Sequence, residues 1–158
     1  MNARKKYAFS LLEITLALGG AAISLLVIFS LLPIGLQTNQ RSIFQIASAD
    51  ILSAVAADLR ATPPTNPRGN AITSTEFGIS IPAAGSPETS TTLFFNDSGQ
   101  SARSLQPDSR YRVTIRFVSN GGGEKAATLT DLQVTWPAGT AITNTQGLAE
   151  MFAAFDRN

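Results

Sequence analysis

The 158-residue chain contains no cysteine and no histidine. It therefore has no disulfide framework, no thiol nucleophile, no Ser-His-Asp triad and no imidazole ligand for a metal ion. Charged residues are also few, at 15% of the chain. Only carboxylates, hydroxyls and the backbone remain for chemistry, and no spacing of acids forms a calcium loop. We expect a protein that is not an enzyme, with no cofactor, no metal and no small-molecule substrate.

Basic residues are unevenly distributed. Arg4, Lys5 and Lys6 lie within the first eight positions, where no acid accompanies them. Without these three, nine basic residues stand against eleven acidic ones, a net charge of −2. Such a chain offers no electrostatic surface for nucleic acid, so we expect no nucleic-acid partner.

A long apolar run follows this basic segment. Residues 9–36 contain 19 apolar residues in 28, too many for the apolar region of a cleaved signal peptide, which has roughly 7–15. As a helix of about 42 Å, the run could cross a hydrocarbon core of ~30 Å. It has no polar face, which argues against a buried core helix. The basic residues before it predict a cytoplasmic N-terminus and a C-terminal part outside the inner membrane.

A possible signal-peptidase site, Ala47-Ser48-Ala49, lies eleven residues beyond the run. Such a site should follow the apolar region closely in extended chain, whereas this one falls in a segment with helical periodicity. We interpret it as coincidental.

Glu13 is the one acid in the apolar run, and no basic residue between Phe9 and Leu36 could neutralise it. A carboxylate at the centre of a membrane costs roughly 2.5–3.5 kcal/mol, and less near an interface. Either Glu13 lies close enough to the cytoplasmic face to reach water, or its partner belongs to another chain.

The run Lys5-Lys6-Tyr7-Ala8, followed by Phe9-Ser10-Leu11-Leu12-Glu13 and an apolar helix, resembles the processing signal of type IV prepilins and type II secretion pseudopilins. The resemblance implies that a prepilin peptidase removes the leader, residues 1–8 with Arg4, Lys5 and Lys6, by cutting between Ala8 and Phe9. It also implies N-methylation of Phe9 and pairing of Glu13 with the amine of a neighbouring pilin-like subunit. The family usually has glycine before the cut, where this chain has Ala8.

Two sites weaken the predicted helix. Gly19-Gly20 and the Pro33 to Gly35 region combine a loss of about 1 kcal/mol for each glycine with about 3 kcal/mol for an interior proline. The sequence favours a kink near Pro33 and Gly35. In the pilin-like family such sites resemble the stretch where the helix bends or melts in a filament.

Residues 37–62 continue as an amphipathic second half of the helix. Its apolar stripe contains Ile43, Phe44, Ala47, Ile51, Val55 and Leu59, and we place Asp58 among the polar positions. Packing of this stripe against a sheet is the expected role.

Residues 63–158 are predicted to form a small β-rich domain. Strands are expected over Thr91–Phe95, Tyr111–Phe117 and Leu132–Trp136, with a weaker one over Phe77–Ile81. Residues 148–155 could be helix or strand. One helix on an antiparallel sheet is an α+β fold, and the resemblance implies a pilin-like one.

Leu31 to Leu36 and the late Trp136-Pro137 are also similar to the Verru_Chthon cassette protein B group, itself defined by resemblance to pseudopilins. The acids near turns, Asp97, Asp108, Glu124 and Asp131, are interpreted as solvated side chains. For Arg110, Arg112 and Arg116 we weigh an interface against protection of a sheet edge. The competing hypothesis for the whole chain is a signal-anchored periplasmic binding protein or enzyme.

Overall fold

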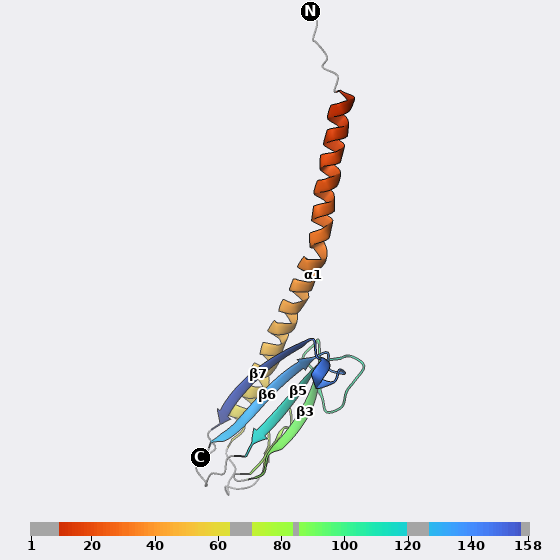
Figure 1. Ribbon diagram of the computed structural model, residues 1–158. Helices are drawn as coiled ribbons and strands as arrows, with labels where there is room; N and C mark the ends of the chain where they lie inside the picture. The colour runs from red at the N-terminus through yellow and green to blue at the C-terminus, as the bar shows by residue number, and fades with distance from the viewer. Residues whose placement is uncertain (1–9, 64–70, 84–85, 120–126, 156–158) are drawn as a thin grey trace, which may run out of the picture. The chain divides into compact units, whose positions relative to one another are not determined.

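The computed structural model describes residues 10–63, 71–83, 86–119 and 127–155. One long helix near the N-terminus is followed by an antiparallel sheet (Figure 1), which confirms the α+β class. The chain divides into two compact units between Ile43 and Phe44, and the helix contributes to both. The predicted leader and cleavage site, including Ala8 and Phe9, lie outside the described residues.

The helix, α1 (Leu11–Ala61), begins directly after Ser10 and ends two residues before Pro63. The Ser10 hydroxyl accepts a hydrogen bond from the backbone N–H of Glu13 at 3.3 Å, which caps the first turn. Pro33 lies inside the helix, and α1 continues through Pro33 and Gly35 without interruption. The helix has 51 residues.

The main sheet has five strands in the order β4-β3-β5-β6-β7. They are β3 (Thr89–Asn96), β4 (Ser101–Ala102), β5 (Ser109–Val118), β6 (Thr128–Trp136) and β7 (Gly147–Phe155), and all neighbours pair antiparallel. A separate pair joins β1 (Ile72–Thr73) to β2 (Ser80–Ile81), and a short 3-10 turn, η1 (Ile142–Asn144), precedes β7. Residues 147–155 are thus a strand, and the strand expected from Phe77 begins only at Ser80.

The core lies between one face of this sheet and the last turns of α1, which pass behind β7 and β6 in Figure 1. The predicted alternation is confirmed on β5. On β6 the expected Leu132, Val134 and Trp136 are buried, but Asp131 and Thr135 on the other face are buried too. From α1, buried Val55 and Leu59 complete the core, together with Ile51. Ile43, expected in the same stripe, is 54% exposed because the buried part of the helix begins only at Phe44.

The two ends of the helix segment in the second unit contact opposite ends of the sheet. The ring centroid of Phe44 lies 6.2 Å from the ring centroids of both Tyr111 and Trp136. At the other end, the Arg60 guanidinium lies 5.9 Å from the ring centroid of Phe155. Tyr111 lies near the start of β5, and Phe155 ends β7. The helix segment therefore runs along the strands rather than across them.

Candidate functional site

The first half of α1 exposes a continuous apolar surface. All the described side chains from Ser10 to Ile43 are exposed, among them Leu12, Leu16 and Leu26 at about 70%. The helix is long and apolar enough to cross a membrane. Burying such side chains contributes about 25 cal/mol per Å² of apolar surface, so water is an unfavourable surrounding for this segment. A membrane or a layer of similar helices would remove these apolar side chains from water.

Glu13 lies in the first turn of this apolar surface and is itself exposed. It is the only ionisable residue between Ser10 and Gln40. A carboxylate in the first turn interacts favourably with the helix dipole, by about 0.3–1 kcal/mol, which is less than the cost of placing it at the centre of a membrane. The helix therefore offers only partial compensation to this charge.

The hydroxyls of the same segment do have partners within the helix. The Oγ1 of Thr15 donates to the Leu12 carbonyl at 2.9 Å, and the Oγ of Ser24 donates to Gly20 at 2.9 Å. The Oγ of Ser30 donates to Val27 at 2.7 Å. Such bonds allow polar side chains to face an apolar surrounding at little cost. Glu13 differs from these residues because it carries a charge.

The capping role of Ser10 was not predicted, although the spacing Ser10-x-x-Glu13 is the sequence signature of a capping box. The glycines that weaken the helix have no neighbouring side chain over them in the described part of the chain. A Cβ atom added at Gly19, Gly20 or Gly35 would meet nothing within 4 Å. These glycines leave room for the close approach of another helix.

A buried carboxylate, Asp58, links α1 to the segment around β1 and β2. It is only 5% exposed, which contradicts its assignment to the polar positions of the helix. Its Oδ2 accepts from the Ser74 hydroxyl at 2.5 Å and from the Phe77 N–H at 3.1 Å, and its Oδ1 accepts from the Glu76 N–H at 3.0 Å. These donors come from a segment sixteen or more residues away, so no local pattern in the sequence could reveal them.

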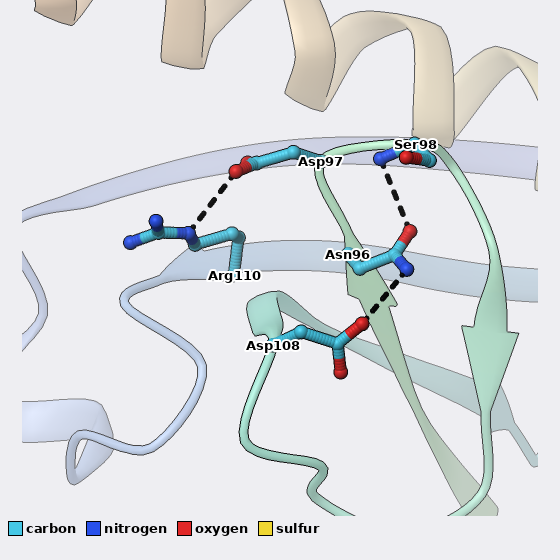
Figure 2. A network of polar contacts seen from close by, with 5 residues as sticks. All are labelled: Asn96, Asp97, Ser98, Asp108 and Arg110. Carbon is cyan, nitrogen blue, oxygen red and sulfur yellow. Dashed lines mark hydrogen bonds and ion pairs between the residues drawn. The ribbon is translucent and has the colours of Figure 1, made fainter.

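Two of the acids near turns fasten the β3–β4 turn to the start of β5 (Figure 2). The Asp97 Oδ2 lies 3.1 Å from the Arg110 Nε, and the Asn96 Nδ2 donates to the Asp108 Oδ2 at 3.0 Å. The Asn96 Oδ1 accepts from the Ser98 N–H at 3.1 Å. The five residues drawn in Figure 2 border a shallow polar hollow. In the Asp97–Arg110 pair both side chains are more than 60% exposed, so water screens the pair.

The phenol of Tyr111 lies close to this network and is buried. Burial raises the pKa of Tyr111 above its ordinary value, because ionisation would place a charge away from water. The negative charge of Asp97 raises this pKa further, while Arg110 partly offsets the effect. Tyr111 therefore stays neutral at physiological pH and packs in the core.

The arginines of β5 do not protect a sheet edge, because β5 is flanked by β3 and β6. Arg116 pairs with Asp131 at 2.8 Å and with Glu88 at 3.6 Å. Arg112 differs, since its Nε and Nη2 atoms are buried without a hydrogen-bond partner. Asp131 is 8% exposed as a side chain, which corrects its interpretation as a solvated acid. Glu124 lies outside the described residues.

Within the described ranges, no three acidic side chains gather where they could hold a metal ion. Ala47-Ser48-Ala49 lies inside α1, and Ser48 is fully buried, so this sequence is not presented as extended chain. Arg4, Lys5 and Lys6 lie with Ala8 and Phe9 outside the described part. A comparison with protein-family models, with curated proteins and with solved structures found no match.

Proposed function

We propose that this chain is a prepilin-like subunit. A prepilin peptidase removes residues 1–8 and methylates Phe9, and the exposed half of α1 then assembles with other pilin-like subunits into a pilus or pseudopilus-type structure. Before assembly the chain is a single-pass inner-membrane protein with its C-terminal unit in the periplasm. The support is the basic leader, the Ala8-Phe9 junction and Glu13, followed by a helix long enough to cross a membrane.

The observation that carries the proposal is the isolation of Glu13. It is the only charge on a surface of exposed apolar side chains, and it lies in the turn nearest to Phe9. A methylated N-terminal amine remains cationic, so the amine of a neighbouring copy can neutralise this carboxylate. Such a pair would also fix the axial offset between neighbouring helices. The fold of the second unit, a helix on an antiparallel meander, is compatible with a pilin-like protein.

The test compares Glu13→Gln with the wild-type chain in membranes. The glutamine keeps the size of the side chain and removes its charge. We expect normal insertion but at least a tenfold loss in the co-purification of partner subunits. A buried charge pair contributes more than about 1.4 kcal/mol to binding, and about 1.4 kcal/mol corresponds to a tenfold change in affinity. Thr15→Ala is the matched control, since the Thr15 hydroxyl is already bonded within its own helix.

Equal co-purification by Glu13→Gln and wild type would contradict the proposed role of the charge. The result would then favour the signal-anchored periplasmic protein. That alternative requires neither the leader cleavage nor Glu13.

A further inference from the structure

Among the described strands, β7 forms one edge of the main sheet. This nine-residue strand pairs with β6 without a register shift, and it is the last strand in the order of the described sheet. Proteins usually protect such an edge with charged side chains, lysine above all, or with proline or a bulge. β7 has no lysine, no proline and no bulge; its single charge is the exposed Glu150, while its Leu148 and Phe152 are 53% and 72% exposed. The backbone groups on its outer side pair with no described strand and are suited to pairing with an added strand.

The opposite edge of the sheet is open over part of its length. β4 covers β3 only at Phe94 and Phe95. The segment Thr89–Leu93 pairs with β5 on one side and with no described strand on the other. Its sequence, Thr-Ser-Thr-Thr-Leu, contains three β-branched threonines, a residue type favoured in strands.

The directions of the strands decide which edges can meet. Each neighbouring pair from β3 through β5 and β6 to β7 is antiparallel, so β3 and β7 run in opposite directions. Antiparallel pairing of β7 with β7 of a second copy would turn that copy end over end. The helix segment from Phe44 to Arg60 lies along the strands, so the two chains would enter their sheets from opposite ends. Copies anchored in one membrane enter from the same end.

We infer that β7 of one copy pairs antiparallel with Thr89–Leu93 of a second copy of this chain, placed beside it in the same orientation. This inference rests on the proposed function, which anchors all copies in one membrane. Repetition of the contact produces a row of copies in which each sheet continues into the next.

The position of β4 limits the register of this contact. Because β4 occupies the edge at Phe94, Gly147 at the start of β7 can lie no farther along β3 than Leu93. The register that pairs all of Thr89–Leu93 places Gly147 at this limit, so that Leu148 lies opposite Thr92 and Glu150 opposite Ser90. All four side chains belong to the sheet face away from α1, where their positions are exposed. A five-residue pairing is much smaller than a stable interface between free proteins, so it acts between copies that their helices already hold together.

The absence of native cysteine makes the contact testable by disulfide formation. Two full-length copies with different tags are co-expressed in membranes, one with Glu150→Cys and the other with Ser90→Cys. Directly opposite residues in a sheet lie within the Cα separation that a disulfide requires. We expect a mixed disulfide dimer, and none from either variant expressed alone. Leu148→Cys with Thr92→Cys provides a second pair if one variant fails to fold.

Thr114→Cys is the matched control, because Thr114 lies on the same sheet face but in the central strand β5. Dimers of Glu150→Cys with itself would indicate β7–β7 pairing and overturn the inference, as would equal crosslinking to Thr114→Cys or no crosslink in either pair. If the pairs fail while the chain begins at Phe9 and requires Glu13, only the edge pairing is wrong. A chain that retains Met1 contradicts the proposed function itself.

Discussion

Removal of the Asp58 carboxylate should destabilise the second unit strongly. In Asp58→Ala the Ser74 hydroxyl and the N–H groups of Glu76 and Phe77 all lose their acceptor. Hydrogen bonds to a charged group contribute roughly 1.5–3 kcal/mol each. Glu76 is exposed and Phe77 half-buried, so water can replace part of this loss. We therefore expect a decrease of about 3 kcal/mol in the free energy of unfolding.

The assay is denaturant unfolding of the full chain in detergent, followed by the fluorescence of Trp136. Trp136 is the only tryptophan and is 8% exposed in the core, so its emission reports the packing of the sheet on α1. Asp50→Ala is the matched control, because Asp50 is an exposed acid on the same helix. It should change stability by less than about 0.5 kcal/mol.

Ser74→Ala gives an intermediate case. The Ser74 hydroxyl donates to Asp58 and accepts from the Ile79 N–H at 2.9 Å. We expect a loss of about 1–2 kcal/mol. If Asp58→Ala costs no more than Asp50→Ala, the carboxylate does not join α1 to the segment around β1 and β2, and the reasoning is refuted.

Three further predictions concern the core. Leu132→Ala, at a fully buried position, should lower the free energy of unfolding by about 3 kcal/mol, whereas a similar loss for the exposed Leu148→Ala would contradict the assigned core. Gly147→Ala should cost at least about 2 kcal/mol and alter the fluorescence of Trp136, because the new Cβ would lie 2.0 Å from the Trp136 ring; wild-type stability would refute this packing. The contribution of the neutral Tyr111 phenol to the free energy of unfolding is complete below its unfolded pKa of about 10, and it is lost as pH rises through the higher folded pKa. Tyr111→Phe should therefore flatten the decline in unfolding free energy in alkali. An unchanged slope would contradict the raised pKa.

Periodicity was sufficient to predict the central strands and most of the buried stripe of the helix, but not the exposure of Ile43 or the burial of Asp58. If one face of the sheet must be buried, the alternation around Val113 and Ile115 decides which side chains point inward. The structure confirms that Val113 and Ile115 are buried. Residues 148–155 could not be assigned in this way, since LAEMFAAF suits both periods. Pairing with β6, which is a tertiary contact, determines that they form a strand.

The polar contacts were less predictable, because they join residues that are distant in the sequence. Asp58 finds its donors around Glu76, and Asp131 finds Arg116 across a strand pair. Arg110, Arg112 and Arg116 could be placed on one strand face, but their central position depends on the order of the strands. Glu13 could be singled out from the sequence, because a single charge in an apolar run requires no tertiary information; its role in assembly stays a prediction.

The most direct test of the proposed function is the N-terminus of the chain purified from membranes of a host that contains a prepilin peptidase. Intact-mass and N-terminal analysis should find a chain that begins at a methylated Phe9. In a host without the peptidase the same chain should keep residues 1–8. A mature chain that begins at Met1 in both hosts, or at Asp50 after Ala47-Ser48-Ala49, would contradict the account.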